Sequence, residues 1–380
     1  MKKIIPFNDL SRLSNKIKNK SIVKIRKIIN SGTFISGEEV EKFEKEFSRY
    51  IGCKFSIGVA SGTDALKISY QALGLREGDE VIVPAMSFFA TISPLLQMGI
   101  KPILVDVDEK GLIDCSLIEE RITSRTKAII VVHLYGNICN MEEIAKIAKA
   151  NNLYIIEDAC QAHGSSYKGR KAGSFGTIAA FSFYPSKNLG AFGDGGAITT
   201  SNKNLAIKSK ILGDHGQARK YYHEFLGYNS RLDSIHAAVL RIKLKLLEKD
   251  NKRRRAIAKI YEKDFSLLPI NLIEDRMGYV PNFHLYVVKT KQRDKLKIYL
   301  KEKGINSSIH YPIPLHLHEA VSFLNYKKND FSVAEQLAKE SLSLPLFPEM
   351  TNKEVDFVIK SVKDFFLNQT FHKKQRNYNK

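Results

Sequence analysis

Segments typical of buried strands alternate with segments typical of helices through the first half of the chain. Short continuous apolar runs are followed by longer segments in which apolar residues recur every three to four positions. Because parallel strands need a crossover connection, usually a helix, this order predicts an α/β fold with a mainly parallel central sheet flanked by helices. The predicted strands are 55–60, 80–84, 103–107, 126–134 and 153–158, and the predicted helices are 63–73, 90–98 and 141–151.

The second half of the chain predicts a smaller unit. One long helical pattern over 233–264 can bridge two units. At 380 residues the chain is long enough for two domains. We expect a large domain over 1–250, which begins with a helical arm, and a small α/β domain over 251–380. The small domain should contain a strand over 280–290 and helices over 294–303, 331–343 and 352–367.

The charge of the chain raises the possibility of nucleic-acid binding. There are 60 Lys and Arg against 40 Asp and Glu, a net charge of +20. These residues are spread along the chain, and they cluster only at 252–255 and 372–376, without a recognition helix, zinc finger or RNA-binding aromatic signature. We therefore expect no nucleic-acid partner. A diphosphate substrate would use part of the charge, and we interpret 252–255 as a solvated helix face rather than a second diphosphate contact.

Hydropathy and cysteine placement bear on location. No segment approaches the roughly 18 continuous apolar residues of a membrane span, and the N-terminus turns polar before a signal-peptide core could form. We expect a cytoplasmic protein without membrane contact. The four cysteines form no C-x-x-C pair, which predicts reduced thiols and no metal site. They are Cys53, Cys115, Cys139 and Cys160.

One lysine and one acid stand at positions suited to covalent chemistry. Lys187 follows an apolar run and precedes several glycines, while Asp158 ends the predicted strand 153–158. An isolated lysine is more often a solvated side chain. A lysine that binds an aldehyde, with an acid that faces a pyridinium nitrogen, is however the basic equipment of pyridoxal phosphate chemistry. We interpret Lys187 and Asp158 as that pair.

A candidate phosphate site lies where the first predicted strand meets a helix. The sequence Ser61-Gly62-Thr63-Asp64 places unpaired backbone N–H groups at a helix start, where a dianion is favoured. Capping of the helix by Ser61 or Thr63 alone would explain the same residues. Both interpretations stay open on this segment.

Taken together, these segments resemble the DegT/DnrJ/EryC1/StrS family of sugar-nucleotide aminotransferases, from Pro6 to about Thr351. The resemblance implies the pyridoxal phosphate-dependent transferase fold of type I, as in aspartate aminotransferase. Six motifs in the family's order carry it. They are 61–66, 84–91, 157–162, the lysine segment 181–197, 227–233 and 310–316.

By this resemblance, further residues acquire roles around the cofactor. Phe88 would stack on the ring, and Gln161 would lie near its phenolic oxygen. Asn229 would reach the phosphate of the neighbouring subunit, which implies a homodimer with shared active sites. The remaining phosphate contacts would come from Gly62, Thr63, Asp64 and Ser182.

The resemblance also implies the reaction. An amino group would pass from L-glutamate to the cofactor and then to a keto-sugar, with Lys187 as the group that moves a proton. Some relatives have histidine in place of this lysine and perform dehydration. Because this chain keeps lysine, aminotransfer is favoured, with a pyridoxal phosphate-dependent dehydratase or lyase as the alternative.

The segment 214–233 bears on the sugar. It is similar to members that aminate a 3-keto sugar, which favours a dTDP-3-keto-6-deoxyhexose, and leaves a UDP-linked 3-keto sugar or a 4-keto sugar as alternatives. Lys220 and Tyr222, from the partner subunit, are candidates for the diphosphate. Candidates for the hexose are Tyr184, His310 and Tyr311.

Overall fold

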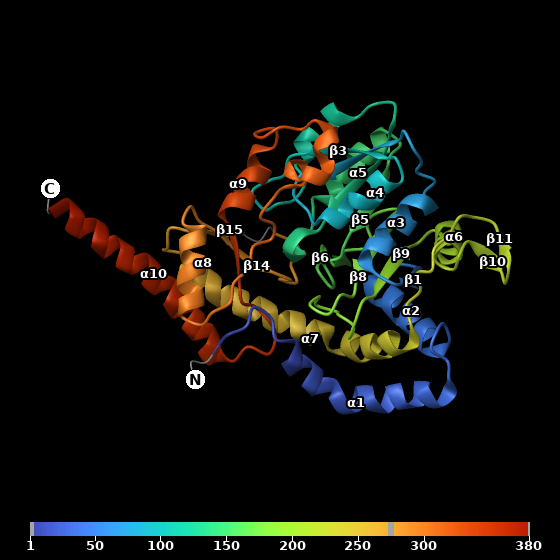
Figure 1. Ribbon diagram of the computed structural model, residues 1–380, viewed down its shortest axis with the longest axis horizontal. Helices are drawn as coiled ribbons and strands as arrows, with labels where there is room; N and C mark the ends of the chain where they lie inside the picture. Colours follow the sequence, from blue (N-terminus) through green and yellow to red (C-terminus); the bar gives the residue numbers. More distant parts are fainter. Residues whose placement is uncertain (1–3, 273–276, 379–380) are drawn as a thin grey trace.

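The centre of the protein is a seven-stranded sheet, seen in the computed structural model, which describes residues 4–272 and 277–378 (Figure 1). Within this sheet only β9 runs opposite to the other six strands. The predicted mainly parallel sheet is therefore confirmed. The strand order is β1 (Phe55–Val59), β9 (Gly196–Thr200), β8 (Ile178–Ser182), β5 (Tyr154–Asp158), β4 (Thr126–Val132), β2 (Glu80–Pro84) and β3 (Lys101–Val105).

Helices connect and cover these strands, as the alternation predicts. Helix α3 (Gly62–Ala72) packs against β8 and β9, α6 (Lys203–Gly213) against β1 and β9, and α5 (Met141–Ala150) against β5. Helix α2 (Glu38–Ile51) lies between β1 and the long helix α7 (Ser234–Phe265). The central strands are apolar along their length because they are buried on both faces.

Helix α7 spans two hydrophobic cores. Its residues Ala237, Leu240 and Leu247 belong to the core around the central sheet, whereas Ile257, Tyr261 and Phe265 belong to a second core. Helix α1 (Leu10–Ser31) runs along α7 as an N-terminal arm. The expected domain boundary at residue 250 falls inside α7, and it stays a prediction.

The second core lies under a small sheet and two helices. The sheet order is β12 (Asn271–Leu272), β14 (Tyr286–Lys289) and β15 (Ser341–Leu344), with α8 (Arg293–Glu302) and α10 (Asn352–Tyr378) packed beside it. Elsewhere, β6 (Ser166–Tyr167) pairs with β7 (Arg170–Lys171) and β13 (Tyr279–Val280), and β10 (Gln217–Arg219) pairs with β11 (Tyr222–His223). No helix in the described residues is long and apolar enough to cross a membrane.

Four predicted elements differ from the structure, and one of them, the helix expected over 352–367, is longer and runs as α10 to Tyr378. The helix expected over 90–98 is a 3₁₀ turn (Phe89–Thr91) followed by the short α4 (Ser93–Gln97). The strand expected over 280–290 is interrupted after β13, where Pro281 has no N–H to donate to a sheet. The helix expected over 331–343 ends as α9 (Ser332–Glu340), because the next residues pair with β14.

Candidate active site

A cavity of about 390 Å³ opens at the carboxyl edge of the parallel strands. The residues that follow β1, β2, β5 and β8 all reach it, because parallel strands end at one edge of a sheet. Ten of the fourteen predicted site residues line it. They are Gly62, Thr63, Phe88, Asp158, Gln161, Ser182, Tyr184, Lys187, His310 and Tyr311.

Asp158 is held in place by hydroxyl groups from the turn after β2. Its Oδ2 accepts a hydrogen bond from Thr91 Oγ1 at 2.8 Å, and Thr91 Oγ1 lies 2.6 Å from Ser87 Oγ. The carboxyl group is buried, as are both hydroxyls. Thr91 belongs to one of the motifs quoted above, but sequence reasoning gave it no role. The structure makes it the residue that orients Asp158.

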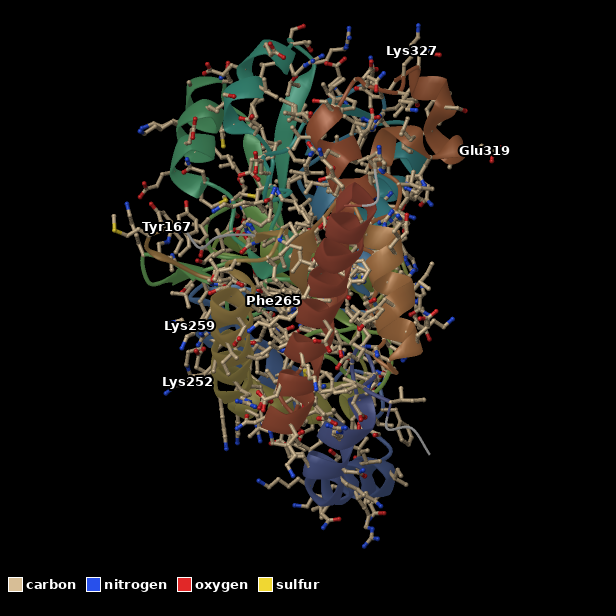
Figure 2. All side chains as sticks on the ribbon, turned by 90° about the vertical axis from the view of Figure 1, so that its left-hand side faces the viewer. Tyr167, Lys252, Lys259, Phe265, Glu319 and Lys327 are labelled. Carbon is tan, nitrogen blue, oxygen red and sulfur yellow. The ribbon has the colours of Figure 1, made fainter. Side chains whose placement is uncertain are left out.

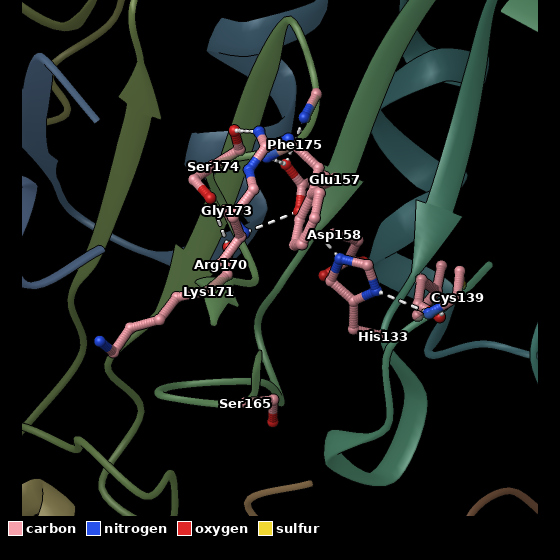
Figure 3. Close-up of polar contacts among 12 residues, drawn as sticks. His133, Cys139, Glu157, Asp158, Ser165, Arg170, Lys171, Gly173, Ser174 and Phe175 are labelled. Atoms are coloured by element: carbon pink, nitrogen blue, oxygen red, sulfur yellow. Dashed lines mark hydrogen bonds and ion pairs between the residues drawn. The ribbon is translucent and has the colours of Figure 1, made fainter. Parts of the chain in front are cut away.

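The neighbouring carboxylate on β5 faces the other way and serves the fold (Figure 3). Glu157 is fully buried and accepts backbone N–H bonds from Gly173, Phe175 and Gly176 at 2.5–2.7 Å. Its Oε2 also lies 2.9 Å from His133 Nε2. Because successive strand residues point to opposite faces, only Asp158 of this pair reaches the cavity.

Lys187 lies in a loop that is hydrogen-bonded to helix α7. Its backbone N–H donates to Tyr184 O at 2.8 Å, and the buried Lys243 of α7 donates to the carbonyl of Gly190. A Cβ at position 190 would lie 2.4 Å from Pro185 O, so the loop requires glycine there. Burial lowers the pKa of the Lys187 ammonium. A lysine with a lowered pKa is more often present as the nucleophilic amine.

The start of α3 also lines the cavity, through Ser61, Gly62 and Thr63. Ser61 caps the helix by accepting the Asp64 N–H at 3.1 Å. A Cβ at position 62 would lie 2.6 Å from Ser182 Cβ, so that only glycine lets the two segments meet. Asp64 lies outside the cavity lining, and its carboxylate accepts from Ser230 Oγ at 2.8 Å. Its predicted contact with the phosphate stays a prediction.

Three predicted residues form one connected wall. Gln161 Oε1 accepts the Tyr135 N–H at 2.7 Å, and Gln161 Nε2 donates to Tyr311 Oη at 3.0 Å. The Tyr311 ring lies 5.7 Å from that of the exposed Phe88, centroid to centroid. Phe88 is therefore the aromatic face open to a ligand, while its neighbour Phe89 packs on the core.

The other predicted residues lie away from this cavity. Lys220 and Tyr222 belong to the exposed hairpin formed by β10 and β11, which projects from one end of the molecule (Figure 1). Asn229 is exposed, and its Oδ1 accepts from Arg231 Nη2 at 2.7 Å. A single chain therefore does not bring these residues to Lys187.

The basic run 252–255 is only in part the solvated face that we expected. Figure 2 shows Lys252 on the outer side of α7, where it is exposed. Arg254 is buried instead, and donates to the carbonyls of Phe283 at 3.3 Å and Leu346 at 2.8 Å. The expectation is wrong for Arg254, because helix periodicity turns this residue into the second core.

The cavity residues fit pyridoxal phosphate. A lysine amine and a carboxylate face one cavity, beside the N-terminus of α3, where backbone N–H groups favour a dianion such as a phosphate. The carboxylate is kept ready to pair with a ring nitrogen, and Phe88 offers a flat apolar face. When bound, the cofactor supplies an electron sink for reactions at an amine-bearing carbon.

Fold and site together define a pyridoxal phosphate-dependent transferase of fold type I, and an aminotransferase within that class. The chain belongs to the DegT/DnrJ/EryC1/StrS aminotransferase family, whose model matches residues 15–363. The family expectation from the motifs is confirmed, and so are the cofactor and the enzyme class.

Three similar proteins illustrate the match. A "pleiotropic regulatory protein" of Geobacillus stearothermophilus is 41% identical over 95% of this chain and 98% of its own. A "dTDP-3-amino-3,6-dideoxy-alpha-D-galactopyranose transaminase" of Aneurinibacillus thermoaerophilus is 45% identical over 94% of this chain and 99% of its own. The crystal structure of Streptomyces venezuelae DesV in complex with a ketimine intermediate is 39% identical, covers 95% of this chain and 98% of its own, and gives a TM-score of 0.93.

Proposed function

We propose that this aminotransferase moves an amino group from L-glutamate to a dTDP-3-keto-6-deoxyhexose and so makes a 3-amino sugar. The observation that carries the proposal is the 45% identity, over nearly the whole of both chains, to a relative named for that kind of product. The resemblance of 214–233 to 3-keto members points the same way. UDP-linked 3-keto and 4-keto sugars are the alternatives that an assay must separate.

The chain's own residues support both halves of the reaction. Lys187 provides an amine that can take a proton from one carbon and return it to another, and burial lowers its pKa, which eases the release of that proton. Asp158 provides a carboxylate that faces the same cavity and is oriented by Thr91. Tyr184, His310 and Tyr311 stand at the cavity wall, where a hexose would enter.

The first experiment is an absorption spectrum of the purified protein with and without L-glutamate. We expect the visible band of the bound cofactor to bleach when glutamate is added. The aminated protein is then mixed separately with dTDP-3-keto, dTDP-4-keto and UDP-linked 3-keto sugars, and products are identified by mass spectrometry. An amino sugar from the dTDP-3-keto compound alone supports the proposal. A product that has lost water without gaining nitrogen would instead establish the dehydratase alternative.

We also propose a homodimer in which the 214–231 segment of one chain completes the cavity of the other. The support is that Lys220, Tyr222 and Asn229 are exposed and away from the cavity of their own chain. In a twofold dimer, one surface segment can reach the equivalent site of its partner. The four cysteines are all free, which suits a cytoplasmic location.

Mixed dimers test this arrangement directly. Lys187→Ala chains should be inactive and Lys220→Ala chains should have a raised KM, so activity is measured with the sugar well below KM; a dimer of one chain of each kind then holds one site with both residues intact. Random mixing should then restore about a quarter of the wild-type sites, since half of the dimers are mixed and each has one intact site. No recovery on mixing would show that both residues act within one chain.

A further inference from the structure

His284 is a cavity residue that sequence reasoning missed. It lines the same cavity as Lys187, and it comes from the segment just before β14, almost a hundred residues further along the chain. Its Nδ1 lies 3.1 Å from Oδ1 of Asn188, the residue that follows Lys187. An imidazole on the cavity wall is thus hydrogen-bonded to the loop that carries Lys187.

The hydrogen bonds of Asn188 determine which nitrogen of His284 carries the proton. Asn188 Nδ2 donates to Asn251 Oδ1 at 2.9 Å and to the Asn282 carbonyl at 3.1 Å. Both partners are acceptors, so the Asn188 amide cannot be turned round without placing oxygen against oxygen. Asn188 Oδ1 must therefore accept, and His284 Nδ1 must be the donor.

The partners of Asn188 are themselves fixed. Asn251 Nδ2 donates to the His163 carbonyl at 2.8 Å, which leaves its Oδ1 for Asn188. Asn282 Nδ2 donates to the carbonyls of Gln161 and His163, and its Oδ1 accepts the His284 backbone N–H at 2.9 Å. Asn251 and Asn282 are fully buried. Each donor in this network faces an acceptor, which is what holds one tautomer.

With Nδ1 protonated, a neutral His284 presents Nε2 as a hydrogen-bond acceptor. Burial lowers the pKa of His284 well below its usual value, so the ring stays neutral at physiological pH. His310, also on the wall, differs because Nδ1 lies 2.9 Å from Ser343 Oγ, a hydroxyl that can donate or accept. His284 alone of these two is restricted to one role.

We propose that His284 is a positioning residue whose Nε2 accepts a hydrogen bond from the Lys187 amine when that amine, freed from the cofactor, moves a proton at the bound substrate. Both residues line one cavity, and the bond from His284 Nδ1 to Asn188 ties this acceptor to the loop that carries Lys187. The bond directs the nitrogen lone pair toward the reacting carbon. The inference rests on the role given to Lys187 and not on the identity of the sugar.

Two substitutions separate the acceptor role from a structural one. His284→Asn keeps a donor near the Nδ1 position for Asn188 and removes the acceptor at Nε2. His284→Gln reaches further and can place an amide oxygen where Nε2 lies. We expect kcat to fall about tenfold in His284→Asn, with KM for the keto-sugar nearly unchanged, and to recover in large part in His284→Gln. Thermal unfolding of both variants identifies any loss that comes from misfolding.

The opposite outcomes overturn the proposal. If His284→Asn behaves like wild type while His284→Gln is impaired, the residue matters only for its bond to Asn188. If KM rises while kcat is kept, His284 binds the sugar instead. A measurement without turnover completes the test, since ¹⁵N NMR of the cofactor-free protein at pH 7 should show His284 protonated at Nδ1 and bare at Nε2. A ring protonated at Nε2 would refute the assignment, whatever sugar the enzyme uses.

Discussion

The predicted site residues of the cavity wall are fixed by hydrogen bonds, whereas those of the 214–231 segment are exposed on the surface. In the wall, Asp158 and Gln161 are already oriented by bonds to Thr91, Tyr135 and Tyr311 before any ligand binds. In the hairpin, the side chains contact only their neighbours, as where Arg219 lies 3.7 Å above the ring of Tyr222. The cofactor end of the site is therefore built within one chain. The end assigned to the diphosphate is left on the surface, where a second chain can use it.

The largest effect should come from the centre of the wall. Lys187→Ala removes the one lysine amine that lines the cavity among the described residues, and we expect turnover to fall roughly 10⁴-fold or more. Because the side chain faces the cavity, the unfolding temperature should stay close to that of wild type. Steady-state kinetics and thermal unfolding test both parts. Appreciable remaining turnover would remove Lys187 from its role.

Asp158→Asn should have the next largest effect. The amide keeps the shape of the carboxyl group but loses the charge that pairs with a ring nitrogen, so kcat should fall by about 10²- to 10⁴-fold. The fold should be little affected. If kcat changes by less than threefold, the negative charge at this position is not used.

Glu157→Gln is the matched control on the same strand. The new amide keeps one oxygen, which can still accept from Phe175 and Gly176, but it sets its N–H group against the Gly173 donor, where the carboxylate accepted. We expect the free energy of unfolding to fall by about 2–4 kcal/mol, with kcat of the folded protein within a few fold of wild type. Chemical denaturation and kinetics on one preparation measure both. A variant as stable as wild type would show that these bonds contribute little.

The interior should also differ from the hairpin in its response to acid. His163 lies between the rings of Phe181 and Phe183 at 5.3 and 5.9 Å, and burial lowers its pKa to about 3. The unfolded chain takes up this proton near pH 6.5, so stability is full above that pH and falls as the pH drops from about 6.5 toward 3. For this residue, the free energy of unfolding should change by about 1.4 kcal/mol per pH unit within that range.

His163→Leu removes the titrating group from the core. Between pH 8 and pH 5 the free energy of unfolding of wild type should fall by about 2 kcal/mol through this residue, and the variant should not show that loss. His223→Leu in the exposed hairpin is the control, and we expect it to leave the pH slope unchanged. Equal slopes in all three proteins would mean that His163 does not stay neutral in the folded state.

The smallest effect is expected in the hairpin. Lys220→Ala should raise KM for the nucleotide sugar by about tenfold at low salt, and by less at high salt, because an exposed charge is screened. kcat should change little. Lys327→Ala removes the same charge from an exposed position labelled in Figure 2 and should leave KM unchanged. If both variants behave alike, the hairpin contributes only to overall charge.

The sequence predicted the parts of the site that sit at strand ends. Asp158 and Lys187 follow apolar runs, and a parallel sheet brings such positions to one edge, so their meeting follows from the pattern. Thr91 and His284 could not be found in this way. Their roles depend on hydrogen bonds to Asp158 and Asn188, residues 67 and 96 positions away, and periodicity carries no information about such partners. Arg254 shows the same limit, since its carbonyl partners come from distant loops.

The reversed strand β9 also has a consequence for how the chain folds. It separates β1 from β8 and is the strand of the sheet that pairs with β1, so Phe55 finds its partner only at Thr200. During synthesis, β1 therefore stays unpaired until about half of the protein has been made. Strands β2 to β5 can pair earlier, because their partners lie close in sequence. The wall that carries Gly62 should be the last part of the sheet to form, and a chaperone that holds β1 would act in that interval.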